Sequence, residues 1–348
     1  MTTRLSASLI ATAALLPNLL GCGSSDSSST KKDDAAVVFD AADVCGAPKT
    51  AEELIACVKP ANLSADIAEI AQERVPGSSH WQSVQDLCRS RLESYGFAVE
   101  LQNYGTGVNV IGRLAGTVPN SSDVVISAHY DHIAGCPGAS DNAAGLAAAL
   151  EVARLLSSRD NSHPVVIACW DEEERGLIGS KAYADAARAA NQDIGFVVSF
   201  DTIGFLSNDA DSQTLPAGFD ILFPTESAEI VANDSRGDFV SIISDEASAL
   251  LVASFVTHAD SIGLKRSSLV VPQNLLLSPA TGDLRRSDHA SFWVNNYPGI
   301  ILSDTANFRN PNYHCLSGTD SPDTLNMEFV SQITQAAVAA AADVLDAP

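Results

Sequence analysis

The chain has 348 residues, 46% of them hydrophobic, and its 43 acidic against 20 basic residues give a formal net charge of −23. This apolar fraction is enough to bury the core of one large domain or two ordinary ones, which excludes a wholly disordered chain. The acidity and the lack of a Lys/Arg cluster argue against nucleic acid and anionic membrane surfaces as partners, because both bind through basic patches.

The N-terminus is typical of a bacterial export signal. Residues 1–21 carry one charge, followed by a short apolar stretch that polar residues interrupt, and this pattern does not suit a transmembrane helix. The stretch ends in Leu-Leu-Gly-Cys, which resembles a lipoprotein lipobox and predicts cleavage before Cys22 and acylation of its thiol. An ordinary secretory signal cut nearby is the alternative. Residues 22–48 are predicted to form a flexible tether, since only Gly, Ser, Asp, Thr and Lys occupy 23–34.

We therefore expect an exported protein of a bacterial envelope. Its N-terminal lipid is the only membrane contact that the sequence predicts. The outer membrane is favoured, and release outside the cell is the alternative.

Residues 49–348 are predicted to fold as one domain that begins with three helices and two strands. Helical patterns cover 49–59, 63–74 and 78–94, and strand patterns cover 97–104 and 108–114.

A regular alternation of strands and helices follows. Strands are predicted at 124–128, 165–170 and 194–200, with helices at 142–156 and 179–190 between them. This order implies an α/β fold with a mostly parallel, mixed central sheet and helices on both faces.

The last part of the chain is less regular. A helix at 287–295 with Ser287 as its N-cap, a strand at 299–303 and a helix at 326–345 are predicted. Within 205–285 only a helix at 246–262 and a strand at 268–271 are predicted.

Histidine and acidic residues follow the ends of the predicted strands. In open α/β sheets ligands bind outside the carboxyl ends of the strands, so these side chains are expected at one edge. Taken singly, each has a plainer explanation, such as a helix cap for Asp141 or a core position for His129. Their coincidence favours a shared site, and its members are His129, Asp141, Glu174, Asp201 and His314.

These five residues supply three negative charges and two neutral donors. Imidazole and carboxylate without paired cysteine motifs suit zinc at a catalytic site. Two Zn²⁺ and one hydroxide bring the charge close to zero, so the sequence predicts two zinc ions per chain, about 3.5–4 Å apart.

Six stretches of the sequence, in family order between residues 125 and 325, resemble peptidase family M28, a group of zinc aminopeptidases and carboxypeptidases. They are Ser127–His132, Gly138–Gly145, Glu173–Ser180, Ser199–Asp201, Ser287–Phe292, and Tyr313–His314 with Asp323–Leu325.

The resemblance implies a zinc-exopeptidase-like catalytic domain that acts on peptides. It implies that Asp141 bridges the two metals, Glu174 and His314 complete one site, and His129 and Asp201 complete the other. It further implies that Glu173 is the general base that takes a proton from the metal-bridging water. Asp131 is expected to orient the imidazole of His129.

The chain departs from the family pattern where the oxyanion is stabilised. Some family aminopeptidases carry a tyrosine three residues before the Ser-Asp-His stretch, and Leu284 stands there in this chain. Arg285, Arg286 or Tyr313 is the predicted replacement, while arginines that serve only as surface charges are the alternative. An arginine that grips a substrate α-carboxylate would instead favour a carboxypeptidase.

Two further residues are expected to line the substrate site. Asp288 and His289 belong to the Ser-Asp-His stretch, which in the family forms the substrate wall and does not bind zinc. Residues 205–285 are expected to shape the specificity pocket.

Seven cysteines are present, and acylation of Cys22 leaves six. Because Asp141 and His314 are expected on one metal, we predict a disulfide between Cys136 and Cys315 beside them. A pairing of Cys45 with Cys57 or Cys88 is the second prediction, and Cys169 is expected to be a buried thiol.

The predicted function is a dinuclear zinc exopeptidase, with an aminopeptidase favoured. A carboxypeptidase or dipeptidase of the same family is the alternative. Two weaker alternatives are a glutaminyl-cyclase-like enzyme with one zinc and a binding lipoprotein on an inactive scaffold. The full set of five ligands and the general base argues against both. The oligomeric state is left open.

Overall fold

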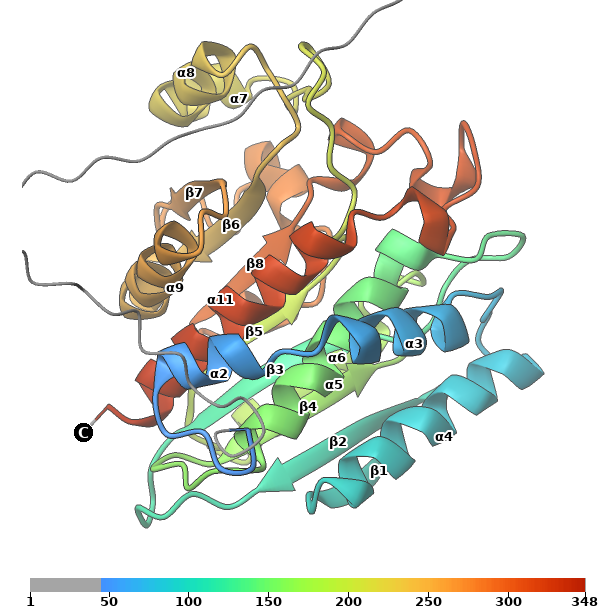
Figure 1. Cartoon of the computed structure of the whole chain (residues 1–348), viewed down its shortest axis with the longest axis vertical. Coiled ribbons are helices and arrows are strands. Elements are labelled where there is room, and N and C mark those ends of the chain that lie inside the picture. Colours follow the sequence, from blue (N-terminus) through green and yellow to red (C-terminus); the bar gives the residue numbers. More distant parts are fainter. Residues whose placement is uncertain (1–44, 348) are drawn as a thin grey trace, which may run out of the picture. The chain divides into compact units, whose positions relative to one another are not determined.

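An eight-stranded mixed sheet runs through the computed structural model, which describes residues 45–347 (Figure 1). The predicted export signal, Cys22 and the tether as far as residue 44 lie outside the described residues. At the end of the predicted tether, Cys45 is joined to Cys57 by a disulfide.

The four central strands are parallel to one another, as the strand and helix pattern predicts. Across the sheet the order is β1-β2-β4-β3-β5-β8-β6-β7, with β4, β3, β5 and β8 parallel and β2 and β6 antiparallel to the strands beside them at the centre. The strands are β1 (Ala98–Asn103), β2 (Val108–Leu114), β3 (Asp123–His129), β4 (Val165–Trp170), β5 (Ile194–Phe200), β6 (Val240–Asp245), β7 (Arg266–Val271) and β8 (Gly299–Ser303).

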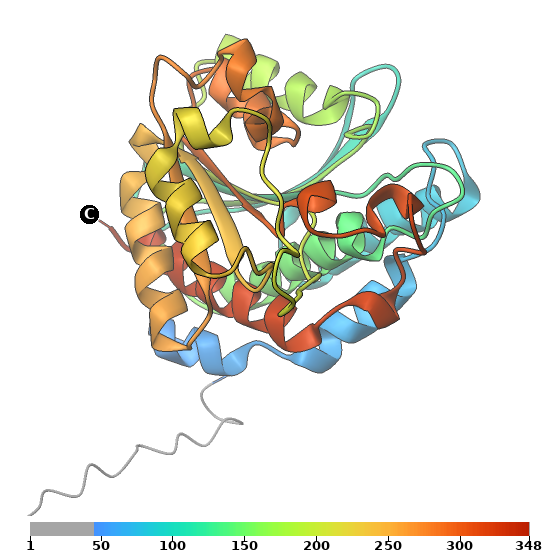
Figure 2. The same ribbon diagram turned by 90° about the horizontal axis from the view of Figure 1, so that it is seen from above.

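Helices cover both faces of this sheet (Figure 2). One face carries α2 (Ala51–Cys57), α3 (Pro60–Ile70), α4 (Ser79–Ser94), α5 (Ala144–Leu156), α9 (Ala249–Ser261) and α11 (Met327–Leu345). The other carries α6 (Ile178–Ala189), α7 (Phe219–Leu222), α8 (Pro224–Ala232) and α10 (His289–Val294). Among residues 45–347, none of the helices is long and apolar enough to span a bilayer.

The alanine-rich helix α5 lies at the centre of the larger layer, with 12 of its 13 residues buried. Its small side chains allow close packing against β3, α3 and α11. A Cβ at Gly145 would collide with the side chain of Asn142, so only glycine fits at this contact. The start of α5, which follows Asp141, therefore packs closely against Asn142 and against Phe200 of β5.

Three expectations from the sequence differ from the structure. Helix α3 begins at Pro60, whose fixed φ suits the first helical position, and not at residue 63. The N-cap of α10 is Asp288 and not Ser287, and no side chain caps this helix. Helices α7 and α8 and strand β6 lie within 205–285, where the sequence pattern predicted no element at those positions.

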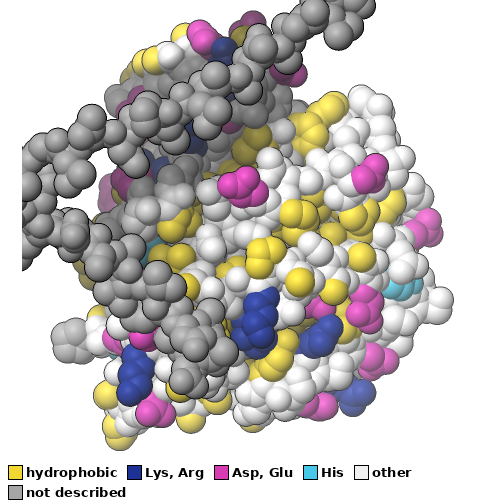
Figure 3. All heavy atoms as spheres, viewed as in Figure 1, with side chains coloured by type: hydrophobic (Ala, Val, Ile, Leu, Met, Phe, Trp, Pro, Cys, Tyr) yellow, Lys and Arg dark blue, Asp and Glu magenta, His cyan; other side chains and the backbone are white. Residues whose placement is uncertain are grey.

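Basic side chains stand apart from one another on the face drawn in Figure 3, which carries α2, α3 and α11. They do not merge into a continuous patch on the part of this face that is drawn in colour.

Candidate active site

Four neighbouring parallel strands end at one edge of the sheet, and a candidate residue follows or ends each of them. His129 is the last residue of β3, the glutamates 173 and 174 follow β4, and Asp201 follows β5. His314 lies in the loop that follows β8. Side chains far apart in sequence therefore meet at the carboxyl ends of the strands.

His129 faces three carboxylates in the buried half of this site. Its Nε2 lies 3.2 Å from Asp141 Oδ1, 3.4 Å from Asp201 Oδ1 and 4.0 Å from Glu173 Oε2. On the other side of the ring, Nδ1 lies 3.2 Å from the Asp131 carbonyl and 3.6 Å from its carboxylate. The imidazole is thus held with Nε2 directed into the acidic cluster.

His314 occupies the outer half of the site. Its Nε2 lies 3.1 Å from Asp141 Oδ2 and 3.1 Å from Glu174 Oε2. The two oxygens of Asp141 therefore face different imidazoles, one in each half. All five predicted ligands converge here.

The donor set fits a pair of zinc ions. His314 Nε2 is buried and makes no hydrogen bond among the described residues, although two carboxylate oxygens are near it. Burial alone would lower the pKa of His314, but the carboxylates of Asp141 and Glu174 outweigh it and raise the pKa to about 10. The cluster thus attracts positive charge, and its nitrogen and oxygen donors are those that zinc accepts.

Asp131 fixes which of the four consecutive acidic residues enter the site. Its carboxylate accepts hydrogen bonds from the backbone N–H groups of Glu173 (3.0 Å) and Glu174 (3.3 Å). Asp171 turns away to accept from the Trp81 indole at 2.8 Å, and Glu172 pairs with Arg175 at 2.7 Å. Glu173 and Glu174, and not their neighbours, therefore face the cluster.

Glu173 is buried beside both His129 and Asp201. Burial raises the pKa of Glu173 well above its ordinary value, and the charges of Asp201 and Asp288 add to this against the opposing effect of His129. A carboxyl with a raised pKa suits a group that accepts and returns a proton.

An apolar cavity opens beside Asp201. Phe219, Ile243, Leu269 and Ile301 are among its lining residues. Two of these, Phe219 and Ile243, lie in elements that the sequence pattern did not predict, so residues 205–285 do shape the cavity.

Arg286 and Tyr313 also line this cavity. The Tyr313 ring stacks on His314 with 3.9 Å between ring centroids, and its hydroxyl accepts a hydrogen bond from Arg286 Nη2 at 3.3 Å. Leu284 is buried in the cavity wall. Arg285 points elsewhere and donates to the Ser278 carbonyl.

Asp288 and His289 are both buried, and His289 lines the cavity together with Asp201. Burial raises the pKa of Asp288 to about 7. Burial lowers the pKa of His289 to about 4, and its Nε2 donates to the Leu284 carbonyl at 2.9 Å. His289 is therefore a neutral wall residue, outside the five converging side chains.

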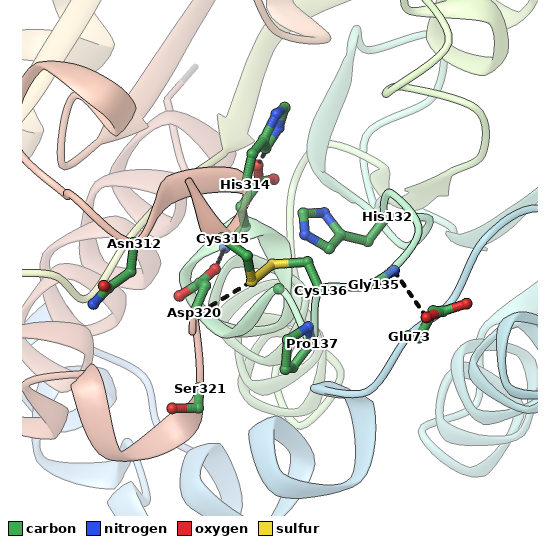
Figure 4. The surroundings of a disulfide bond; sticks show 12 residues. Glu73, His132, Gly135, Cys136, Pro137, Asn312, His314, Cys315, Asp320 and Ser321 are labelled. Atoms are coloured by element: carbon green, nitrogen blue, oxygen red, sulfur yellow. Dashed lines mark hydrogen bonds and ion pairs between the residues drawn. A yellow bond between two sulfur atoms is a disulfide. The ribbon is translucent and has the colours of Figure 1, made fainter. Parts of the chain in front are cut away.

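A disulfide joins Cys136 to Cys315, as the sequence predicts (Figure 4). It links the loop before Asp141 to the residue after His314 across 179 positions of sequence. His314 has a φ of 54°, in the left-handed region that few non-glycine residues adopt, so its backbone is held by its surroundings. Cys45 pairs with Cys57, and Cys88 and Cys169 are buried thiols.

Two residues at the site lie outside the predicted ligand set. His132 Nδ1 lies 2.7 Å from Glu174 Oε1, opposite the oxygen that faces His314. Asp320 accepts hydrogen bonds from the backbone N–H groups of Ser140 and Asp141. The sequence suggests only a rim position for His132, which directly follows Asp131, whereas nothing in it marks Asp320.

Known proteins resemble this chain in sequence or in fold. Leupeptin-inactivating enzyme 1 of Streptomyces exfoliatus is 33% identical over 171 residues, 46% of this chain and 39% of that protein. The uncharacterized protein YfbL of Escherichia coli K12 is 26% identical over 231 residues, 62% of this chain and 65% of that protein. The crystal structure of the LapA aminopeptidase of Legionella pneumophila superposes with a TM-score of 0.64 at 19% identity, covering 91% of this chain and 78% of that one.

The chain spans less than two-thirds of the length of either curated relative. The likeness to LapA is a likeness of fold. The family model described as peptidase family M28 matches residues 109–341, about two-thirds of the chain. This chain therefore belongs to peptidase family M28.

Proposed function

We propose that this protein is a dinuclear zinc exopeptidase that removes residues from the amino ends of peptides. The observation that carries the proposal is Asp141, whose two carboxylate oxygens face His129 and His314 at 3.2 and 3.1 Å. A carboxylate so placed suits a bridge between two metal ions. His129 and Asp201 would complete one site, and Glu174 and His314 the other.

Zinc bound here would polarise the scissile carbonyl and acidify water. Glu173 is the general base in this proposal, because its carboxylate is buried within 4.0 Å of His129 Nε2 and has a raised pKa. It would accept a proton from the attacking water and return it to the leaving amine. Asp131 would hold the His129 ring and the backbone of both glutamates in place.

Substrate features follow from the surroundings of the cluster. The acidic groups of Glu173, Asp201 and Asp288 would favour a free α-ammonium group over a carboxylate. The apolar cavity beside Asp201 would take a hydrophobic side chain of the first residue. The position of Arg286 at the cavity is the one observation that favours a carboxypeptidase, because its guanidinium would form two parallel hydrogen bonds with a substrate α-carboxylate.

Metal content and hydrolysis together test this function. Residues 45–348, purified and free of added metal, are expected to take up two zinc ions and to hydrolyse leucyl-nitroanilide faster than aspartyl-nitroanilide. Chelation is expected to abolish hydrolysis, and added zinc to restore it. If the protein binds two zinc ions and cleaves N-blocked dipeptides but no free-amine substrates, it is a carboxypeptidase and not an aminopeptidase. No zinc uptake would contradict the proposal.

Tyr313 is the proposed donor to the tetrahedral oxygen. Its hydroxyl accepts from Arg286, which leaves its own hydrogen free to donate. We expect Tyr313→Phe to lower kcat by about 10²–10³, the usual loss of one such donor, with zinc content unchanged. Arg285→Met is the control, because Arg285 bonds the Ser278 carbonyl, and its kcat is expected to equal that of the wild type. An unaltered kcat in Tyr313→Phe would remove Tyr313 from the mechanism.

Attachment to a bacterial envelope through a lipid on Cys22 is part of the proposal. The lipobox-like sequence before Cys22 supports it. Mass spectrometry of the N-terminal peptide of the exported protein tests it, and an unmodified Cys22 thiol would exclude the lipid.

A further inference from the structure

Arg74 lies before the residues that the family model matches, yet its side chain is completely buried against the loop that carries Asp141. An arginine has five N–H donors and no acceptor. All five hydrogen bonds of this guanidinium go to backbone carbonyls, those of Gln72, Tyr130, Pro137, Gly138 and Asp141. None goes to a carboxylate, so Arg74 does not neutralise an acidic partner by direct contact.

The opposite side of the same loop is held by Asp320. Its carboxylate accepts hydrogen bonds from the backbone N–H groups of Ser140 (3.0 Å) and Asp141 (3.1 Å). Its own N–H donates to Cys315 Sγ at 3.4 Å, so the disulfide and Asp320 hold the loop together (Figure 4). The carbonyl groups of the loop thus face the Arg74 guanidinium, and its N–H groups face the Asp320 carboxylate. These two sets of contacts fix the orientation of the peptide planes in the loop.

The segment around Arg74 makes two more contacts with this region. The Arg74 carbonyl accepts a hydrogen bond from the His132 N–H at 3.2 Å. The Glu73 carboxylate accepts one from the Gly135 N–H at 2.8 Å (Figure 4). The segment after α3 therefore contacts the stretch between His129 and Asp141 at several points along its length.

We propose that Arg74 is a positioning residue for the metal centre. It holds the loop at 137–141 so that the Asp141 carboxylate already points between His129 and His314 before metal binds. A ligand fixed in advance loses less conformational freedom on binding, so the metal binds more tightly. Lysine cannot replace it, because a single ammonium lacks the planar fork that reaches several carbonyls at once. This inference rests on the proposed metal centre.

Zinc affinity of three variants tests the inference. We expect Arg74→Lys and Arg74→Ala to raise the zinc dissociation constant by about 10–100-fold, the usual effect of removing a group that orients a metal ligand. Guanidinium ion at a non-denaturing concentration is expected to restore part of the affinity of Arg74→Ala, whose cavity it can fill, and none in Arg74→Lys. Arg113→Met is the matched control, since Arg113 bonds Asp123 (2.6 Å) at the start of β3, the far end from His129. Its zinc affinity is expected to match that of the wild type.

Hydrogen exchange of the metal-free proteins gives a second readout that does not need metal. The Ser140 and Asp141 amides are expected to exchange faster in Arg74→Lys than in the wild type and in Arg113→Met. Wild-type zinc affinity and wild-type exchange in Arg74→Lys would overturn the inference, and so would an equal loss of affinity in Arg113→Met. Failure of the wild type itself to bind zinc would instead overturn the proposed metal centre, while the exchange rates would still decide whether Arg74 holds the loop.

Discussion

Replacing Glu173 by glutamine is expected to lower kcat by about 10²–10⁴ while both zinc ions stay bound. The amide has nearly the same size as the carboxyl but cannot accept a proton from water. Because Glu173 is buried, the loss cannot be made up by a solvent group. Steady-state hydrolysis and zinc analysis on the same preparation measure the two quantities.

Glu172→Gln is the matched control for this variant. Glu172 is also buried and directly precedes Glu173, but it bonds Arg175 and Thr106 and faces away from the cluster. Its kcat is expected to stay within about tenfold of the wild type, since it contributes no proton-transfer step. A large loss of kcat in Glu172→Gln with none in Glu173→Gln would identify Glu172, and not Glu173, as the general base.

The acidic run after β4 shows how far the sequence could resolve the site. Four consecutive acids at 171–174 allow more than one choice of base and ligand, and only the resemblance to the family selected Glu173 and Glu174. The structure supplies the physical reason, because Asp131 binds the two backbone N–H groups and turns these side chains inward. A contact between residues about 40 positions apart cannot be read from local spacing.

The central sheet was predictable because its strands are buried runs of apolar residues. β4 and β5 match their predicted bounds, since each is mostly apolar and is followed directly by an acidic residue. β6 was missed because Ser241 and Ser244 break its apolar pattern, and its pairing with β7 and β8 comes from tertiary contacts. Arg74 escaped notice for a similar reason, since a lone arginine after a helix carries no local signal.

Replacing Asp141 by asparagine is expected to abolish binding of both zinc ions. The carboxylate faces His129 with one oxygen and His314 with the other, so one substitution weakens both halves of the site. Loss of a group that only orients a ligand already costs about 10–100-fold in metal affinity, and loss of a shared ligand should exceed that. Thermal unfolding checks this, because zinc at 100 times its dissociation constant stabilises the folded protein by about 2.7 kcal/mol. The rise in Tm on adding zinc should therefore disappear in Asp141→Asn.

Two comparison variants distinguish the loss of a ligand shared by both metals from a general loss of structure. Asp201→Asn removes a carboxylate that pairs with His129 but not with His314, so this variant should retain one zinc ion and part of the zinc-dependent rise in Tm. Asp245→Asn alters a buried aspartate that accepts hydrogen bonds from Ser248 and from the backbone of Gly299, the first residue of β8. These contacts lie away from the cluster, so the Asp245→Asn variant should bind two zinc ions. If Asp141→Asn and Asp201→Asn each retained one ion, Asp141 would belong to a single site. The bridging role proposed for Asp141 would then be excluded.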